Sequence, residues 1–433
     1  MRTKRTSATF TIDDPIAFRQ QWLLWSKKYE TVAFYDSNGY TQEKYSRFDG
    51  LAGVGVVDSL MCNVGDAFEQ LQAFYDKHQD WLFGFMGYDL KNEIEALDSQ
   101  NPATLLFPDL FFFVPKIVFY WRTNSLNIAT TAGSPDDVFN EITQFEVDSI
   151  KGYNEMALLQ PALTKAEYLS KIEKIKEEIR QGEIYEMNFC QEFSSSPALL
   201  EPESVFLSLM KQSPTPFAAF FKQNQQYLLC ASPERYLQKK GNKLISQPIK
   251  GTVKKSHNLA EDEAAKKALQ SNPKERAENV MIVDLVRNDL THYAKTGTIK
   301  VEELCGLHSF PKVHHLISTI TAEIQDDIPF MLPLKKTFPM GSMTGCPKVR
   351  AMEIIEQYEE SRRGLYSGTV GYITPKADFD FNVIIRSLLY DKNTQNLSFQ
   401  VGGAITYDSD PLSEYEECLA KAAGVLSTLD ALE

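Results

Sequence analysis

The sequence lacks the cysteine patterns that mark a disulfide framework or a zinc site. Its six cysteines are scattered over 433 residues, with no CxxC pair and no metal-finger spacing. The N-terminus also lacks the apolar run of a secretory signal peptide, so we expect reduced thiols and a cytoplasmic protein. These absences argue against a small secreted scaffold and against a zinc-finger protein.

Positive charge and long apolar runs are also scarce. The formal net charge is −13, which argues against nucleic-acid binding because that function requires concentrated positive charge. The most apolar stretch, residues 105–120, is interrupted by Pro108, Pro115 and Lys116, and it is shorter than the roughly 20 residues that span a bilayer. We therefore expect neither a nucleic-acid partner nor a membrane segment.

Two functional motifs are absent as well. The Gly- and Ser-rich loop at residues 338–348 lacks the GxxxxGK[ST] order of a P-loop, so nucleotide binding is not expected. The loop does lead into a predicted helix, whose N-terminus favours a carboxylate or a phosphate. The chain also has no Gly-x-Cys-x-Gly elbow, so we expect no glutaminase machinery within it.

Strand-like runs follow one another and are separated by helices, without a regular strand and helix alternation. This order predicts an α+β fold with largely antiparallel sheet. The clearest helix starts at a capping box formed by Thr164 and Glu167, and Gly182 stands where it should end. Mixed patterning in residues 121–160 places a boundary there, which gives an N-terminal subdomain, 1–155, and a second domain, 156–433.

A lysine lies between a proline and a glycine in the stretch Pro248-Ile-Lys-Gly-Thr252. Proline fixes its own φ, and glycine permits a turn or a close approach of the backbone. Lys250 is therefore expected on a stiff segment, where it can contact an anion or, if deprotonated, act as a nucleophile. A solvated lysine in a turn is the commoner outcome for a lysine taken alone.

Two predicted helices each carry a pair of glutamates three residues apart, Glu275 with Glu278 and Glu414 with Glu417. Like charges at this spacing repel, so they need a solvated face or a nearby cation. Carboxylates facing each other across two helices suit Mg²⁺, which keeps several waters and takes few protein ligands. A wet helix surface explains the same spacing.

Three further features can hold an anion. Arg386 follows the apolar run 383–385, so it is either paired within the fold or placed to clamp a carboxylate. Backbone N–H groups in residues 402–405 can face an anion, although a close-packed bend also explains this glycine-rich run. Consecutive residues on a strand face opposite ways, so at most one of His314 and His315 serves a site.

Taken together, these stretches resemble the chorismate-utilising enzymes, and within that family most closely the aminodeoxychorismate synthases. The match covers roughly residues 160–430 as an ordered series of motifs: Ser232 to Arg235, Pro248 to Thr252, Glu275 to Asp289, Pro339 to Glu353, Asp380 to Arg386, Gly402 to Ile405 and Glu414 to Lys421. The resemblance implies antiparallel sheets that form a sandwich with helices packed outside, and a chorismate-binding catalytic domain.

The resemblance also implies roles for individual residues. Glu278 and Glu417 would bind Mg²⁺, with Glu275 and Glu414 beside them, and the ion would hold the ring carboxylate of chorismate. Glu234 is the candidate general acid, and His315 would lie near the reacting ring. The substrate-binding residues would be Arg386, Gly403, Ala404, Lys421, Tyr366 and Thr344.

Position 250 separates the branches of the family. Anthranilate synthases resemble this chain but have a small residue there, whereas aminodeoxychorismate synthases have a lysine that acts as a covalent nucleophile. Its neutral amine would attack C2 of chorismate with loss of the C4 hydroxyl, and ammonia at C4 would then expel it. Desolvation and metal-held charge would have to favour the neutral amine.

A second position departs from the family pattern. Isochorismate and salicylate synthases place a water-activating lysine where this chain has Glu186, and the amine-using members usually have glutamine there. A carboxylate can orient an ammonium ion, so we include Glu186 among the catalytic candidates. The alternative that is not an enzyme is a subunit that binds the ligand without catalysing a reaction.

The N-terminal third resembles relatives that form a tryptophan pocket, here with Ser37, Tyr45, Ser46 and Phe48. An ordinary β-turn and hairpin explains these residues nearly as well. Because the chain lacks a glutaminase motif, the resemblance implies a glutamine amidotransferase subunit as partner and source of ammonia.

Overall fold

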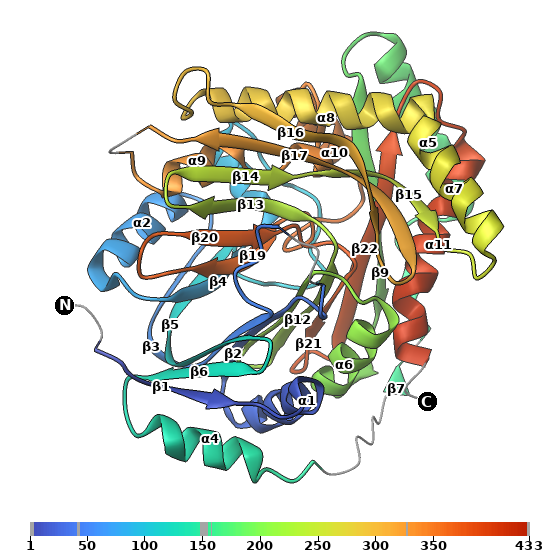
Figure 1. The fold of residues 1–433 in the computed structure, drawn as a ribbon. Helices are drawn as coiled ribbons and strands as arrows, with labels where there is room; N and C mark the ends of the chain where they lie inside the picture. The colour runs from blue at the N-terminus through green and yellow to red at the C-terminus, as the bar shows by residue number, and fades with distance from the viewer. Residues whose placement is uncertain (1–3, 41–43, 148–154, 157, 326–327, 431–433) are drawn as a thin grey trace.

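Strands from both halves of the chain form the centre of this computed structural model, and the helices lie around them (Figure 1). The structure describes residues 4–40, 44–147, 155–156, 158–325 and 328–430. Within these ranges there are a 20-stranded antiparallel sheet and a separate sheet of two short strands. This arrangement confirms the predicted α+β class with largely antiparallel sheet and outer helices.

The N-terminal part of the sheet consists of long apolar strands covered by short helices. The strands are β1 (Thr6–Thr11), β2 (Thr31–Asp36), β3 (Gly50–Cys62), β4 (Leu82–Met86), β5 (Leu110–Arg122) and β6 (Ser125–Thr130). The helices are α1 (Pro15–Trp25), α2 (Ala67–His78), α3 (Lys91–Ile94) and α4 (Pro135–Thr143). Strand β5 contains residues 110–120 of the apolar stretch 105–120. No described helix is long and apolar enough to cross a membrane.

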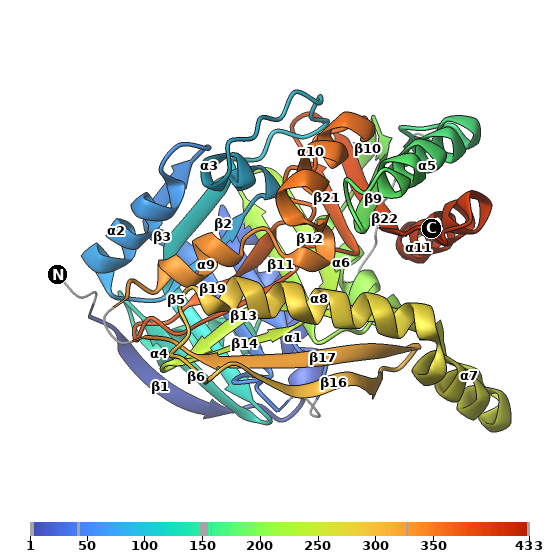
Figure 2. The ribbon, with the colours of Figure 1, turned by 90° about the horizontal axis from the view of Figure 1, so that it is seen from above.

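The C-terminal part supplies most of the remaining strands. They are β9 (Glu186–Ser195), β11 (Phe217–Gln223), β12 (Gln226–Ser232), β13 (Arg235–Lys240), β14 (Lys243–Gln247), β15 (Ile249–Lys254), β16 (Lys300–Ser309), β17 (Val313–Glu323), β19 (Thr369–Ile373), β20 (Phe379–Asn382), β21 (Ser387–Asp391) and β22 (Asn396–Ile405). The helices are α5 (Lys165–Arg180), α6 (Pro202–Gln212), α7 (Leu259–Ser271), α8 (Pro273–Thr291), α9 (Met331–Thr337), α10 (Lys348–Tyr358) and α11 (Pro411–Asp430). Seen from above, α5, α10 and α11 lie on one side and α7 continues α8 outward (Figure 2).

The predicted capping box at the start of α5 is present. The Thr164 hydroxyl accepts a hydrogen bond from the Glu167 N–H at 3.3 Å, and the Glu167 carboxylate accepts one from the Thr164 N–H at 2.9 Å. These two bonds satisfy N–H groups that the first turn of a helix leaves unpaired. The helix ends before Gly182, as predicted.

The two predicted domain ranges share one sheet and one core. Strand β2 pairs with β11, and β4 pairs with β19. In the core, the Phe34 ring lies 5.3 Å from the Trp22 ring and 6.1 Å from the Phe206 ring, centre to centre. Residues 148–154, just before the proposed boundary, lie outside the described part, and the division at residue 155 stays a prediction.

Candidate active site

Lys250 and Glu186 meet inside the protein from strands β15 and β9. The Nζ atom of Lys250 donates a hydrogen bond to Oε1 of Glu186 at 2.5 Å. Both residues are buried, with 9% and 1% of their surface exposed. The second carboxylate oxygen, Oε2, has no hydrogen-bond partner among the described residues. The central lysine of the sequence is therefore held on a strand and is not solvated.

Gly251 explains how Lys250 reaches this position. The pairing of β15 with β17 shifts register between Lys250 and Thr252, and Gly251 has a φ of +85°, which favours glycine. A Cβ atom there would lie 3.0 Å from Oε2 of Glu275. Glycine at this position therefore lets strand β15 turn close to Glu275 of helix α8.

The amine of Lys250 is held in its charged form. Burial lowers its pKa, but the nearby carboxylates of Glu186, Glu278 and Glu234 raise it, and the net result is a pKa above the ordinary value. The covalent mechanism requires the neutral amine. In this structure the three carboxylates outweigh desolvation, so the amine must give up a proton before it can act as a nucleophile.

Glu234 is a buried carboxyl group with a raised pKa. The Ser342 hydroxyl donates a hydrogen bond to its Oε1 at 2.6 Å. Burial raises the pKa of Glu234 to about 7, although the hydrogen bond from Ser342 and the charge of Lys250 lower it. A carboxyl group that is partly protonated near neutral pH is suited to general acid catalysis. The sequence placed Ser342 in the right loop but did not single it out.

His315 is neutral and fully buried. Its Nδ1 lies 2.7 Å from the Thr252 hydroxyl, while Nε2 has no hydrogen-bond partner among the described residues. Burial and the neighbouring charge of Arg386 lower the pKa of His315 to about 3. The adjacent His314 points away and bonds Asp262 on α7 at 3.0 Å, so one histidine of the pair lies at the site, as the strand geometry predicts.

Arg386 lies in the break between strands β20 and β21, with a φ of +52°. Residues 381–390 read as one strand-like run in the sequence, but the backbone leaves the strand at residues 383–386. The guanidinium has no hydrogen bond or ion pair among the described residues. Burial lowers its pKa, while Glu234 raises it. Of the two readings of Arg386, this geometry favours an anion clamp over a structural pair.

The acidic pairs of helices α8 and α11 face one another across a lysine. Lys274 Nζ lies 3.5 Å from Oε1 of Glu414 and 3.9 Å from Oε1 of Glu278. Burial raises the pKa of Glu278 to about 7, although Lys250 lowers it. Oε1 of Glu278 is buried without a hydrogen-bond partner among the described residues. This is the electrostatic environment of a cation site, in which Lys274 supplies the positive charge.

Glu275 and Glu417 also lie near Lys274, whose charge acts on both carboxylates. Burial raises the pKa of Glu275, and Glu417 pairs with Lys421 at 2.8 Å. No group of three or more His, Cys, Asp or Glu side chains within the described ranges is arranged to hold a metal ion. Mg²⁺ often takes only one or two protein carboxylates, and waters and substrate complete its shell. Magnesium binding at these residues stays a prediction.

The predicted substrate-binding residues fall into two groups. Lys421 donates a hydrogen bond to the Gly402 carbonyl at 2.8 Å, and a Cβ atom built on Gly403 would lie 3.5 Å from Glu414 and 3.7 Å from Glu417. Gly403 and its neighbour Ala404 therefore adjoin the acidic residues of α11.

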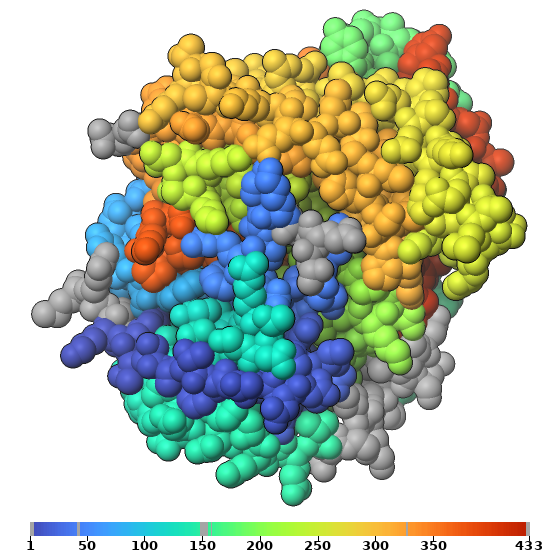
Figure 3. Space-filling model, in the orientation of Figure 1, coloured from blue at the N-terminus to red at the C-terminus, as the bar shows by residue number. Residues whose placement is uncertain are grey.

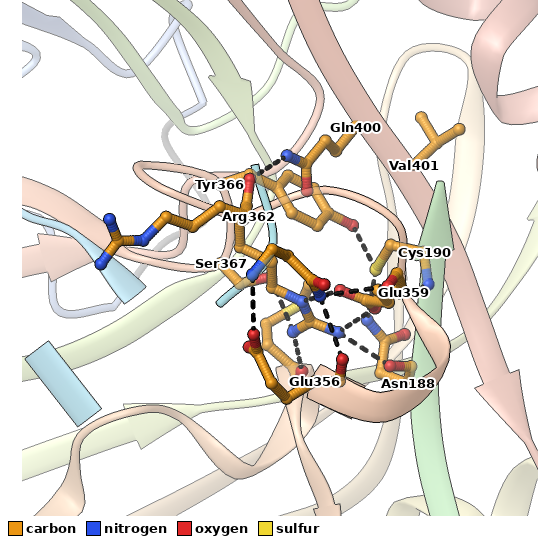
Figure 4. Close-up of polar contacts among 12 residues, drawn as sticks. Asn188, Cys190, Glu356, Glu359, Arg362, Tyr366, Ser367, Gln400 and Val401 are labelled. Carbon is orange, nitrogen blue, oxygen red and sulfur yellow. Dashed lines mark hydrogen bonds and ion pairs between the residues drawn. The ribbon is translucent and has the colours of Figure 1, made fainter. Parts of the chain in front are cut away.

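The other group is Thr344 and Tyr366, whose hydroxyls are engaged with protein atoms. The Thr344 hydroxyl lies 3.3 Å from the carbonyls of Met340 and Gly341. The Tyr366 hydroxyl accepts a hydrogen bond from Cys190 Sγ at 3.4 Å (Figure 4). Substrate contacts by these two residues stay predictions.

The predicted tryptophan residues line two cavities beside Arg235. One, of about 70 Å³, is bordered by Ser37, Ser46 and Phe48, and the other, of about 290 Å³, is bordered by Tyr45. Figure 3 shows the face on which residues 44–50, in blue, lie beside residues in orange, and Lys44 pairs with Glu302 of strand β16 at 2.9 Å. Tryptophan binding stays a prediction.

The chain matches known proteins over most of its length. A family model described as chorismate binding enzyme matches residues 30–427. The anthranilate synthase component I-like protein of Synechocystis is 33% identical, covering 82% of this chain and 73% of that protein. Aminodeoxychorismate synthase component 1 of Escherichia coli is 30% identical, covering 91% and 92%.

The fold is shared with a solved structure as well. The crystal structure of anthranilate synthase component I from Streptococcus pneumoniae matches with a TM-score of 0.76 and 24% identity, covering 88% of this chain and 92% of that one. The family resemblance read from the sequence is thus confirmed. The chain belongs to the chorismate-binding enzymes.

Proposed function

We propose that this enzyme converts chorismate and ammonia to 4-amino-4-deoxychorismate, on the route to 4-aminobenzoate and folate, as an aminodeoxychorismate synthase component I. The observation that carries the proposal is the buried amine of Lys250, which contacts Glu186 and lies close enough to Glu234 and Glu278 for their charges to raise its pKa. A protein that only binds a ligand needs no buried amine facing proton carriers. The Escherichia coli relative carries the same name.

The substrate's anionic groups would be held by Arg386 and Lys421. Arg386 has a guanidinium without a partner among the described residues, and planar bidentate recognition of a carboxylate is the contact it makes best. Lys421 extends the positive charge from helix α11. Mg²⁺ bound by Glu278 and Glu417, with Glu275 and Glu414 beside it, would neutralise the ring carboxylate of chorismate.

The first chemical step needs a neutral lysine and a protonated acid. The Lys250 ammonium passes a proton to Glu186, 2.5 Å away. The neutral amine forms a bond to C2 of chorismate, the two conjugated ring double bonds shift, and the C4–O bond breaks. Glu234 gives its proton to the departing hydroxyl, which leaves as water. The pKa of Glu234, about 7, provides the acid form at neutral pH.

The second step restores every group. Ammonia bonds to C4, the two double bonds shift back, and the C2–N bond to Lys250 breaks so that the lysine leaves as a neutral amine. Glu234 takes the excess proton from the new ammonium group, and Lys250 regains its proton from Glu186. The sum is chorismate plus ammonia giving aminodeoxychorismate plus water. A glutamine amidotransferase subunit would supply the ammonia in the cytoplasm.

The decisive experiment is mass spectrometry of the protein incubated with chorismate and Mg²⁺ but without ammonia. We expect a covalent adduct on the peptide that contains Lys250, and its disappearance when ammonia is added. Lys250→Ala should lose the adduct and the activity, whereas Lys254→Ala, an exposed lysine on the same strand, should keep both. Full activity of Lys250→Ala would rule out the covalent mechanism.

Anthranilate synthesis is the second candidate. It is favoured by the charged state of Lys250, because an ammonium ion paired with Glu186 is not a nucleophile. A product assay separates the two reactions: release of anthranilate without an added lyase would replace our proposal. Turnover without any ammonia would instead indicate an isochorismate or salicylate synthase.

A further inference from the structure

Arg363 is a buried arginine near the site whose guanidinium makes five hydrogen bonds to protein atoms. It is 3% exposed. Its Nε and Nη2 atoms donate hydrogen bonds to the two carboxylate oxygens of Glu359 at 2.9 and 2.7 Å. Its guanidinium lies 4.7 Å from the centre of the Tyr88 ring. The charge is therefore compensated, and the planar group is fixed in one orientation.

The rest of the guanidinium binds the backbone that carries the Lys250 partner. The Nη2 atom of Arg363 donates a hydrogen bond to the Asn188 carbonyl at 2.9 Å, and Glu359 accepts one from the Cys190 N–H at 3.0 Å. Figure 4 shows Asn188, Cys190 and Glu359 together. Asn188 and Cys190 lie two and four residues after Glu186 on strand β9, so they fix the start of this strand.

The same group reaches two more segments of the site. The Nη1 atom of Arg363 donates a hydrogen bond to the Met343 carbonyl at 2.7 Å, and Met343 follows Ser342, the partner of Glu234. Nη1 also lies 3.2 Å from the Ser367 hydroxyl. The Ser367 N–H in turn bonds the Ile384 carbonyl at 3.0 Å, in the break of the sheet that carries Arg386.

We infer that Arg363, held by Glu359, is a positioning residue that fixes Glu186, Ser342 and Arg386 relative to one another. The roles of these three residues in catalysis rest on the function proposed above. One planar cation connects three backbone segments that are distant in the sequence. Catalytic groups must be held to within a fraction of an ångström. A lysine at position 363 can keep the charge but cannot reproduce five donors in a fixed fork.

The test is Arg363→Lys, read by acetylation of Lys250 with acetic anhydride and peptide mass spectrometry, without chorismate. A loosened Glu186 no longer holds the Lys250 ammonium. We expect labelling of Lys250 to rise about ten-fold, the ratio that corresponds to one weakened charged hydrogen bond of about 1.4 kcal/mol. Labelling of Lys239, a buried lysine on strand β13, should not change.

Arg362→Lys is the matched control, because the neighbouring Arg362 pairs with Asp89 at 3.0 Å and its side chain runs away from Asn188 and Glu359 in Figure 4. If Arg363→Lys does not fold, Glu359→Gln weakens the same contacts while keeping the shape. Equal labelling of Lys250 in wild type and in the folded variant, or an equal rise with Arg362→Lys, would overturn the inference.

Kinetics separates this inference from the proposed function. If Arg363 positions the acid, kcat of Arg363→Lys falls and its pH dependence changes shape, which a mere loss of stability would not cause. If labelling rises as expected but wild-type protein makes no aminodeoxychorismate, the proposed function fails and the positioning role stands.

Discussion

Replacing Glu186 by glutamine tests the ion pair at the centre of the site. Glutamine has nearly the same shape and keeps an oxygen that can accept a hydrogen bond from Lys250, but it removes the negative charge. The pair is buried, with 2.5 Å between Nζ and Oε1, so solvent screens it little. We expect the pKa of Lys250 to fall strongly.

The size of the fall follows from the charges. Two unit charges about 4 Å apart, at an effective dielectric constant of about 20, attract by about 4 kcal/mol, which equals about three pKa units. The amide oxygen replaces part of this attraction, and the charges of Glu278 and Glu234 remain nearby. We therefore expect the pKa of Lys250 to fall by about two units.

The assay is the pH dependence of Lys250 acetylation, followed on the isolated peptide by mass spectrometry. Glu183→Gln is the control, because Glu183 lies three residues earlier and pairs with the half-exposed Arg350 at 2.8 Å. An acetylation midpoint in Glu186→Gln within about half a unit of the wild-type value would refute the ion-pair account. The control should leave the midpoint unchanged.

Stability gives an independent check with a defined sign. The folded pKa of Lys250 is raised, so the pair's contribution to stability is complete below the unfolded pKa and is lost as pH rises through the folded pKa. At pH 7 the full contribution is present. Glu186→Gln should therefore lower the free energy of unfolding by about 3 kcal/mol at that pH, as measured by denaturant titration.

Three further predictions concern charges around the pair. Glu234→Gln should abolish turnover. Because the folded pKa of Glu234, about 7, exceeds the unfolded value of 4.5, the stability of the wild-type protein falls as pH rises between these values. The variant should lack this fall and should be up to about 3 kcal/mol more stable than the wild type at pH 8. Lys274→Gln should bind Mg²⁺ several-fold more tightly in calorimetry, since the ion no longer competes with an ammonium between two carboxylates, whereas the exposed Arg276→Gln should not. Arg386→Gln should weaken chorismate binding by about 10- to 100-fold without lowering thermal stability, and the surface variant Lys392→Gln should change neither.

Local sequence signals predicted what depends on neighbouring residues. The capping box of Thr164 and Glu167 and the stop at Gly182 concern contacts within one helical turn, and both are present. The position of Lys250 on a stiff segment also follows from its flanking residues. The register shift that places its amine next to Glu186 depends on β17, which follows about 60 residues later, so no local pattern could show it.

Other features of the site required the fold. The break at residues 383–386 interrupts an apolar run that reads as one strand, because the residues that replace the strand pairing lie on other segments. Lys274 stands four residues before Glu278, a spacing that marks an ion pair on a helix, yet its second partner, Glu414, belongs to a helix 140 residues away. The link from Arg363 to three segments has no sequence signature of its own.

The free oxygen of Glu186 bears on the choice between ammonia and water. Oε1 is occupied by Lys250, and Oε2 is buried without a hydrogen-bond partner among the described residues. A buried carboxylate oxygen is stabilised more by a cationic donor than by a neutral one, because the desolvated charge is then compensated. Before it takes the proton of Lys250, the ionised Glu186 should therefore hold ammonium in preference to water. A lysine at this position would repel ammonium and activate water instead. It follows that Glu186→Gln should raise the KM for ammonia more than the KM for chorismate, and an equal effect on both would show that Oε2 does not face the nucleophile.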